Sequence, residues 1–260
     1  MTKIVGILNI TPDSFFDGGR YDAKEAALKQ LENLILQGAH IVDIGAESTR
    51  PNAMPLSAEQ EWARLQEILP QIILWVKNCN KQNSKNIKTS LDSRHYQNIA
   101  KALDLGIDII NDVSGCESEE IIKLAAKSGK DLILMHNLGV PADKNKIIDQ
   151  NLDVIEVLKD WLQQKWQILQ SFGVKKQQVI FDPGIGFGKT SEQSLQIIER
   201  VEDLQNLGFP LYIGHSNKSF LDILDWPEAN KNCSRAEKTK AVSQFLIQKN
   251  IDYLRLHKII

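Results

Sequence analysis

The chain has 260 residues, of which 42% are hydrophobic and 25% charged, and its 33 acidic and 31 basic side chains give a formal charge of -2. The length suits one well-buried core, while so small a net charge disfavours a nucleic-acid partner. No apolar run approaches the roughly 20 residues of a membrane span, and the N-terminus lacks a signal-peptide pattern, so we expect a cytoplasmic protein with no membrane partner.

Short β-rich runs recur along the chain and are separated by stretches with helical spacing. The predicted strands are Ile4–Leu8, Ile41–Ile44, Lys88–Leu91, Ile107–Ile110, Leu132–Met135, Val179–Phe181, Leu211–Ile213 and Tyr253–Leu256. Strands that are apolar throughout are typical of a parallel sheet covered on both faces. Eight β units without a linker or repeat favour an α/β fold of the (β/α)8 TIM barrel type, with residues 1–260 as one domain. A doubly wound sheet is the alternative.

Capping signals and apolar stripes predict the helices. Asp22 with Glu25 begins the first, and Ser57 with Gln60 begins a second that runs up to Pro70. Further helices are predicted at Tyr96–Leu105, Glu119–Ala126, about Ile147–Phe172, about Ser194–Leu207 and about Ala236–Gln248. The eighth strand runs almost to the last residue, so we expect a barrel that lacks the final outer helix.

Polar side chains lie at or just after the C-terminal ends of all eight predicted strands. In chain order they are Asn9, Asp43 and Glu47, Asp92, Asn111 and Asp112, His136, Asp182, His215 and Ser216, and Arg255 and His257. Capping of the following helix explains any one of them. A polar group after every strand instead favours a site, because in a barrel these positions converge on the face where barrel enzymes carry out their chemistry.

The loop from Asp182 to Thr190 is rich in glycine. It is not a nucleotide P-loop, because Pro183 stands where that motif needs glycine. A thin backbone would let a flat ligand approach Asp182, whose carboxylate could accept two parallel hydrogen bonds from an amidine-like N–C–N edge. A flexible turn without a ligand is the alternative.

The last strand and its neighbours suggest an anion site. Arg255 and His257 alternate, so both can point inward, and a buried arginine needs a partner such as an anion, with Asn9 on the adjacent strand. Lys218 follows the seventh strand, where barrels often bind phosphate, although a surface lysine is the alternative. For His136, a satisfied core histidine is as good an explanation as a ligand contact.

Other chemistries have little support in the sequence. No cluster of His, Cys and Asp has the tight spacing of a zinc site, whereas a Mg²⁺ ion held mainly by substrate phosphates would leave little trace. Ser14, Ser48 and Ser114 lack the GxSxG context of a hydrolase nucleophile.

Several segments, taken in order, resemble the motifs of dihydropteroate synthases. They are Gly6–Phe15 with Asp17–Gly19, Asp43–Pro51, Ile110–Gly115, Asp182–Lys189, Ser216–Ser219 and Arg255–His257. The resemblance extends from about residue 4 to the end of the chain. It implies a barrel enzyme of folate biosynthesis, a target of sulfonamides, that joins 6-hydroxymethyl-7,8-dihydropterin diphosphate to 4-aminobenzoate and releases pyrophosphate, with Mg²⁺ as cofactor.

Carried over motif by motif, the resemblance implies three groups of binding residues. The pterin would contact Asp92, Asn111, Met135, Asp182, Phe187 and Lys218. The diphosphate would contact Asn9, Thr49, Arg50, Arg255 and His257, with Mg²⁺ near Asn9, and aminobenzoate would contact Phe15, Arg50, Pro51, Lys218 and Ser219. The residues implied in catalysis are Asp92, Asp182, Lys218, Arg255 and His257, which would favour a cationic pterin methylene and a leaving anion.

The chain also departs from the family pattern. Asn217 stands where arginine is usual and Lys258 where aspartate is usual, which puts the affinity for aminobenzoate and sulfonamides in question. We expect an active enzyme; the rivals are a non-catalytic pterin-binding paralogue and a pterin-dependent methyltransferase, which would not need the diphosphate residues. The resemblance further implies a homodimer, and an ending at Ile260 would also fit a fusion with the preceding pathway kinase.

Overall fold

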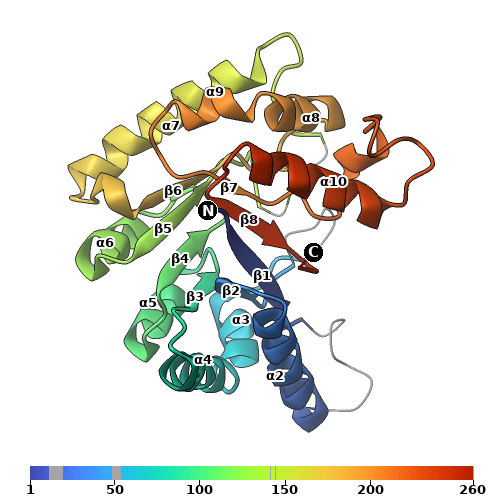
Figure 1. Cartoon of the computed structure of the whole chain (residues 1–260). Helices are drawn as coiled ribbons and strands as arrows, with labels where there is room; N and C mark the ends of the chain where they lie inside the picture. The colour runs from blue at the N-terminus through green and yellow to red at the C-terminus, as the bar shows by residue number, and fades with distance from the viewer. Residues whose placement is uncertain (12–19, 49–53, 141, 144, 260) are drawn as a thin grey trace.

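The computed structural model describes residues 1–11, 20–48, 54–140, 142–143 and 145–259, and it contains a nearly closed parallel barrel (Figure 1). Its strands are β1 (Lys3–Asn9), β2 (Ile41–Gly45), β3 (Lys88–Asp92), β4 (Ile109–Asp112), β5 (Asp131–Met135), β6 (Val179–Asp182), β7 (Tyr212–Ile213) and β8 (Tyr253–Leu256). The sheet order is β6-β5-β4-β3-β2-β1-β8-β7. A parallel bridge between Phe181 and Leu211 brings the two edges together, so the fold is a (β/α)8 TIM barrel.

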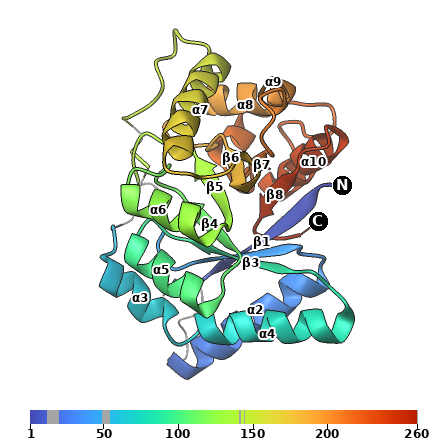
Figure 2. The ribbon, with the colours of Figure 1, turned by 90° about the vertical axis from the view of Figure 1, so that its left-hand side faces the viewer.

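The helices surround the strands. They are α2 (Arg20–Leu36), α3 (Ala58–Leu65), α4 (Leu69–Asn83), α5 (Tyr96–Leu105), α6 (Glu119–Ser128), α7 (Val154–Ser171), α8 (Ser191–Glu199), α9 (Val201–Gln205) and α10 (Arg235–Gln248), with 3₁₀ turns η1 (Lys176–Gln178) and η2 (Ser219–Asp222). Helices α2–α5 lie on one side of the barrel and α7–α10 on the other (Figures 1 and 2). Among the described residues after β8, none is helical.

The predicted strands are confirmed, with one shift that matters for the site. The fourth strand was expected at Ile107–Ile110, but β4 spans Ile109–Asp112. The reason is that the Ile107 N–H still bonds to the Ala102 carbonyl, as part of the turn that ends α5. Asn111 and Asp112 therefore belong to the strand itself, and the parallel register places Asn111 beside Asp92 of β3.

The prediction that the second helix ends at Pro70 is wrong. Ser57 does form the predicted capping box with Gln60 at the start of α3, which ends at Leu65. A separate helix, α4, then begins at Leu69 with Pro70 in its first turn. Proline is favourable there because the first turn of a helix leaves its N–H groups without intrahelical acceptors.

Three other helix boundaries differ from the prediction. The first helix already begins at Arg20, so Asp22 lies inside it. The helix predicted from Ile147 begins at Val154, where the side chain of Asp153 accepts from the Ile155 N–H. The helix predicted from Ser194 to Leu207 is two helices, α8 and α9, which meet at Arg200 in a non-helical conformation.

Apolar side chains form an inner and an outer core. Seven strands each contribute one residue to the cluster inside the barrel: Val5, Ile41, Ile109, Ile133, Ile180, Tyr212 and Tyr253. The larger cluster lies between strands and helices and includes Leu31, Ile72 and Leu158. The barrel is therefore filled by side chains, as in other barrels of this type.

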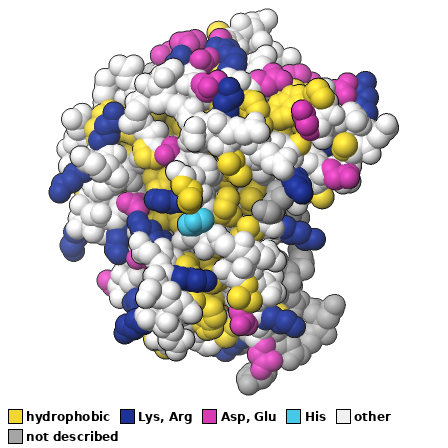
Figure 3. Space-filling model, viewed as in Figure 1, with side chains coloured by type: hydrophobic (Ala, Val, Ile, Leu, Met, Phe, Trp, Pro, Cys, Tyr) yellow, Lys and Arg dark blue, Asp and Glu magenta, His cyan; other side chains and the backbone are white. Residues whose placement is uncertain are grey.

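The surface has mixed charge. On the face shown in Figure 3, basic and acidic side chains are interspersed, and hydrophobic side chains show between them. This agrees with a formal charge of -2 on the whole chain. In the described ranges, no helix is both long and apolar enough to cross a membrane.

Candidate functional site

The carboxyl ends of the strands bring most of the predicted site residues together. Register pairs Asp92 of β3 with Asn111 of β4, and Met135 of β5 with Asp182 of β6. Arg255 lies on β8, beside β1, which ends at the half-buried Asn9. Because parallel strands end on the same face, residues up to 246 positions apart in sequence line one mouth of the barrel.

Arg255 lies between two carboxylates. Its Nε donates to Asp43 Oδ2 and its Nη2 donates to Asp92 Oδ2, both at 2.7 Å. The side chain of Asp43 is fully buried and that of Asp92 is 13% exposed. Burial raises the pKa of Asp92 to about 8 against the attraction of Arg255, and Asp43 adds repulsion. The two carboxylates in turn hold the Arg255 pKa far above its usual value, so the guanidinium stays charged.

Asn111 is oriented by the same buried carboxylate. Its Nδ2 lies 3.2 Å from Asp43 Oδ1 and 3.1 Å from Oδ2. With its amide nitrogen donating to Asp43, the Asn111 side chain is fixed, and its amide oxygen is the group left to accept from a ligand. Asp43 thus positions both a cation and an amide. The sequence marked it as a strand-end polar residue, but its two partners lie 68 and 212 positions away.

Asp182 ends β6 and lies under the glycine-rich loop. Its Oδ1 accepts from the Gly184 N–H at 2.7 Å. Burial raises the pKa of Asp182 to about 6, while this hydrogen bond and the charges of Lys218, Arg255 and Lys189 oppose the rise. Near neutral pH the carboxylate is therefore mainly ionised and can accept hydrogen bonds from a ligand.

Lys218 and Phe187 face one another across the mouth. The Lys218 ammonium lies 4.3 Å from the centre of the Phe187 ring. Phe187 packs with Met135, Val113 and Ala142 in a small apolar cluster. A flat ligand at Asp182 would thus have an apolar surface beside it and a cation nearby. The glycine-rich sequence predicted the approach of a flat ligand to Asp182, and the resemblance implied the contacts with Phe187 and Lys218; both stay predictions.

The remaining predicted residues differ in how well they are fixed. His257 lies 3.1 Å, through Nδ1, from the Ser216 hydroxyl oxygen. Ser219 begins η2 and is exposed. Asn217, where the resemblance implies arginine, adopts a left-handed φ of 60°, which asparagine tolerates better than most residues. Phe15, Thr49, Arg50 and Pro51 lie outside the described residues.

Three of the strand-end polar residues have structural partners. Both oxygens of Asp112 accept from the turn that follows β4, from the Ser114 N–H and hydroxyl and the Cys116 N–H. His215 is buried against Ser243, at 2.8 Å, and burial lowers its pKa to about 4. Glu47 forms a two-pronged ion pair with Arg94, at 2.8 and 2.9 Å. Each of these three side chains therefore has a hydrogen-bond or ion-pair partner within the protein.

His136 belongs to a buried pair that the sequence did not reveal. The Lys189 ammonium lies 2.9 Å from its Nδ1. Burial and the nearby Lys189 charge lower the pKa of His136 to about 2, so the imidazole is neutral and Nδ1 accepts. Lys189 was visible only as the last basic residue of a loop that is not a P-loop. No spacing rule connects it with a histidine 53 positions earlier.

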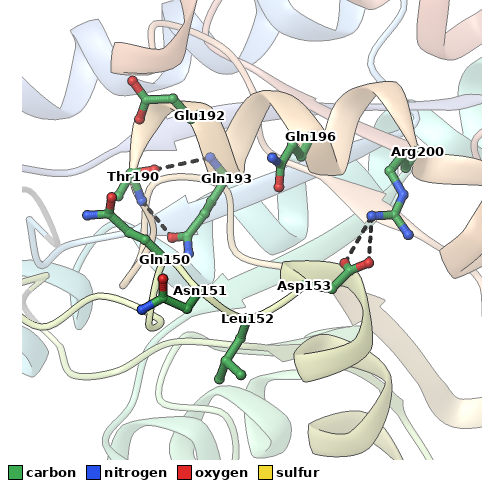
Figure 4. A pocket seen from close by; sticks show the side chains of 9 residues that line it. All are labelled: Gln150, Asn151, Leu152, Asp153, Thr190, Glu192, Gln193, Gln196 and Arg200. Carbon is green, nitrogen blue, oxygen red and sulfur yellow. Dashed lines mark hydrogen bonds and ion pairs between the residues drawn. The ribbon is translucent and has the colours of Figure 1, made fainter.

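A separate hollow of about 360 Å³ lies beside α8, outside the barrel mouth (Figure 4). Arg200 pairs with Asp153 at 2.9 Å, and Thr190 and Gln193 cap α8 reciprocally. These polar groups satisfy one another and hold the loop before α7 against α8. The hollow is therefore explained as a seam between two elements.

Comparison with known proteins identifies relatives of the whole chain. Residues 5–257 match the profile of a family described as "Pterin binding enzyme". The dihydropteroate synthase of Synechocystis sp. is 35% identical, over 99% of this chain and 86% of its own length. A structure of the synthase from Anaplasma phagocytophilum with bound 6-hydroxymethylpterin-monophosphate has a TM-score of 0.85 and 34% identity, covering 99% and 94% of the two chains. The Xanthomonas albilineans synthase with 4-aminobenzoic acid has a TM-score of 0.84 and 27% identity, covering 99% and 88%.

Proposed function

The chain belongs to the pterin-binding enzyme family, and we propose that it is a dihydropteroate synthase, a transferase of folate biosynthesis. It condenses 6-hydroxymethyl-7,8-dihydropterin diphosphate with 4-aminobenzoate to give 7,8-dihydropteroate and pyrophosphate. One observation carries the proposal: an acceptor carboxylate, Asp182, and a partly buried cation, Arg255, share one barrel mouth with an apolar surface at Phe187.

The pterin is the ligand that this end of the barrel suits. Its N–C–N edge carries donors that match the Asp182 carboxylate, in the same fork geometry that pairs arginine with carboxylates. Its ring can pack against Met135 and Phe187, which are both buried in one small cluster. The oriented amide of Asn111 and the Lys218 ammonium supply further polar contacts for the ring atoms.

The diphosphate is proposed to bind at Asn9, Arg255 and His257, with Thr49 and Arg50. Arg255 supports this role because its guanidinium remains charged although it is largely buried. In the free protein the Asp43 carboxylate balances that charge and Asp92 accepts a second hydrogen bond from the guanidinium. A bound diphosphate would compete with both for Arg255. Aminobenzoate is proposed to contact Ser219 and Lys218, with Phe15, Arg50 and Pro51 on the loops after β1 and β2.

The reaction requires charge stabilisation and positioning rather than a strong nucleophile. The C–O bond to pyrophosphate breaks, its electron pair leaves with the anion, and a cationic pterin methylene forms. Asp92 and Asp182 favour that cation, and Arg255 favours the anion. The amine nitrogen of aminobenzoate then attacks the methylene and loses its proton to solvent. The site must also exclude competing water from the cation.

We propose that Mg²⁺ is bound mainly by the phosphate oxygens of the substrate. Among the described residues, no group of three His, Cys, Asp or Glu side chains could hold a metal ion. Asn9, half-buried at the end of β1, offers one hard amide oxygen of the kind that Mg²⁺ accepts beside phosphate oxygens and water. Bound there, the ion would neutralise charge on the diphosphate.

Quaternary structure and drug response complete the proposal. We infer a homodimer, and a fusion with the preceding pathway kinase is the alternative assembly; relatives that combine two activities in one chain include a "Folate synthesis bifunctional protein" of Chlamydia caviae. Sulfonamides should compete with aminobenzoate, as the sulfonamide complex of the Yersinia pestis synthase suggests. Asn217 removes a cation from that side of the site, so the affinity should differ from that of relatives with arginine.

Pyrophosphate release is the assay that decides the function. The purified protein is mixed with pterin diphosphate, 4-aminobenzoate and Mg²⁺, and pyrophosphate and dihydropteroate are measured together. We expect equal amounts of both, and no release without Mg²⁺. Tight pterin binding without release would indicate a non-catalytic paralogue, and transfer of a methyl group from a folate would indicate a methyltransferase.

A further inference from the structure

Lys189 ends the glycine-rich loop, but its side chain is folded back into the loop and only 7% of the residue is exposed. Its ammonium lies 2.9 Å from His136 Nδ1, 3.1 Å from the Gly184 carbonyl oxygen and 2.9 Å from the Phe187 carbonyl oxygen. An ammonium group has three N–H donors, and here all three have an acceptor. A lysine buried with a complete set of acceptors is held in one place.

Each acceptor belongs to a part of the proposed pterin pocket. Gly184 donates its N–H to the Asp182 carboxylate. Phe187 carries the ring that faces Lys218. His136 follows Met135 at the end of β5, and its own N–H donates to the Asp182 carbonyl oxygen at 2.9 Å. One side chain therefore connects the end of β5, the carboxylate strand β6 and the loop above them.

We propose that Lys189 is a positioning residue for the pterin: it fixes the glycine-rich loop around Asp182 through its three hydrogen bonds, and it adds to the positive charge of Lys218 and Arg255 that favours an ionised Asp182 when the pterin binds. This inference rests on the proposed function, because it assumes that Asp182 receives the pterin. Lys189 does not touch the reacting atoms, and it acts through Asp182 and the loop.

The charged groups around this pair set the expected pH dependence. Burial raises the pKa of Asp182 to about 6, and the Gly184 N–H, Lys218, Arg255 and Lys189 oppose that rise. Burial lowers the pKa of Lys189 to about 7, Asp182 opposes this, and Lys218 adds to it. The His136 imidazole is neutral and contributes only an acceptor. Removal of the Lys189 charge therefore raises the Asp182 pKa, so a larger fraction of Asp182 is protonated at pH 6 and little changes at pH 8.

The test is the dissociation constant of 6-hydroxymethylpterin, measured by calorimetry at pH 6 and pH 8 for the wild type and Lys189→Met. Both proteins bind the same ligand, so its own titration cancels in the ratio of the two constants. If the pKa rises by about one unit, we expect that ratio to be about fivefold larger at pH 6 than at pH 8. A loss of affinity by the same factor at both pH values would overturn the proposed role of the Lys189 charge, and unchanged affinity at both pH values would overturn its role in fixing the loop as well.

Three further variants make the result specific. Lys189→Arg keeps the charge, so its ratio should be the same at both pH values even if the affinity falls. Lys165→Met removes a half-buried lysine outside the loop, which lies over the Trp161 ring, and it should have no pH-dependent effect. Lys189→Gln removes the charge but keeps a donor, and it replaces Lys189→Met if that variant does not fold.

A measurement on folded protein keeps the inference falsifiable if neither charge-free variant folds. In a ¹³C-lysine spectrum, the Lys189 signal is assigned as the one that is missing from Lys189→Arg. This signal should titrate at lower pH in Asp182→Asn than in the wild type, because the negative charge that favours the ammonium is gone. An unchanged titration would show that the two groups are not coupled. Failure of the wild type to bind the pterin at pH 8 would contradict the proposed function itself, not only the role of Lys189.

Discussion

Arg255 is held in the barrel mouth by charge that the substrate can replace. The carboxyl groups of Asp43 and Asp92 both contact the one guanidinium of Arg255. The raised pKa of Asp92 favours its protonated form, which lowers the negative charge of the site. A buried ion pair of this kind contributes little net stability, since desolvation offsets the attraction. The ion pair instead orients Arg255, so that a charged and largely desolvated guanidinium is already in place when a diphosphate binds.

Arg255→Ala should slow the reaction strongly. The loss of one charge contact to the leaving anion should cost about 2–4 kcal/mol of barrier, or about 10²–10³ in kcat. The measurement is pyrophosphate release at saturating substrates. Arg200→Ala is the matched control, because Arg200 pairs with Asp153 and Asp203 on the exposed surface. Turnover of Arg255→Ala within twofold of the wild type would refute the role, as the same result would for Asp92→Asn.

At the level of single residues, the sequence predicted which side chains lie at the barrel mouth but not which of them contact one another. Asp182 and Arg255 were predicted because every predicted strand ends in a polar group and because a buried arginine needs a partner, and both lie in the mouth. The ion pair between Asp43 and Arg255 and the contact between Lys189 and His136 were not predictable. Both depend on side-chain directions inside a closed barrel, which residue spacing along the chain does not determine.

The glycine-rich loop is the element that decides the shape of the site. Gly184 has a φ of 67°, and a Cβ atom there would lie 1.9 Å from the His136 carbonyl oxygen. Gly188 is similarly close to Leu138, with 2.6 Å to its Cγ. The glycines therefore provide close contact between the loop and the end of β5, in addition to the positive φ. The sequence indicated a thin backbone but not what it packs against.

Gly184→Ala should distort the loop and weaken pterin binding. The new methyl group meets a backbone carbonyl that cannot move without shifting β5, and positive φ adds about 1–2 kcal/mol of strain. Gly129→Ala is the control, because Gly129 has nearly the same φ, 65°, with nothing within 4 Å of the added carbon. Urea unfolding should show a modest loss for Gly129→Ala and a larger one for Gly184→Ala, and calorimetry should show reduced pterin affinity for Gly184→Ala alone. Equal effects of the two variants would contradict the steric argument.

Helix positions were predicted well and helix ends less well. Ser57 and Gln60 form the expected capping box because that signal is local. Pro70 was misassigned because proline both ends one helix and begins another, and only the packing of Ile72, Ile73 and Val76 in the core shows which applies. The break at Arg200 has no strong signal of its own. It coincides with the ion pair from Arg200 to Asp153, a contact between distant segments.

In the molecule as a whole, the residues that stabilise the barrel and the residues of the proposed site lie in different layers. The seven-residue inner core fills the barrel, and the polar residues occupy the carboxyl ends of the same strands. The eight-strand alternation was predictable because it depends on apolar runs that are local in sequence. Substitutions in the two layers should therefore have different effects.

Ile133→Ala should destabilise the fold by about 2–5 kcal/mol, because it leaves a cavity in a fully buried layer. Leu74→Ala, at a side chain that is 59% exposed, should change the free energy of unfolding by about 0.5 kcal/mol or less. Urea unfolding followed by circular dichroism measures both. An Ile133→Ala effect as small as that of Leu74→Ala would mean that the inner cluster is not tightly packed.

The join between β6 and β7 has a mechanical consequence. In the described chain these two strands meet through the bridge between Phe181 and Leu211, and β7 itself has two residues. Asp182 ends one side of this join, and Lys218 follows the other. The two sides of the proposed pterin pocket are thus joined by few backbone hydrogen bonds between β6 and β7. The width of the pocket can therefore adjust while few hydrogen bonds are broken. We therefore expect the barrel to yield most easily around β7, where a planar ring must enter and a larger product must leave.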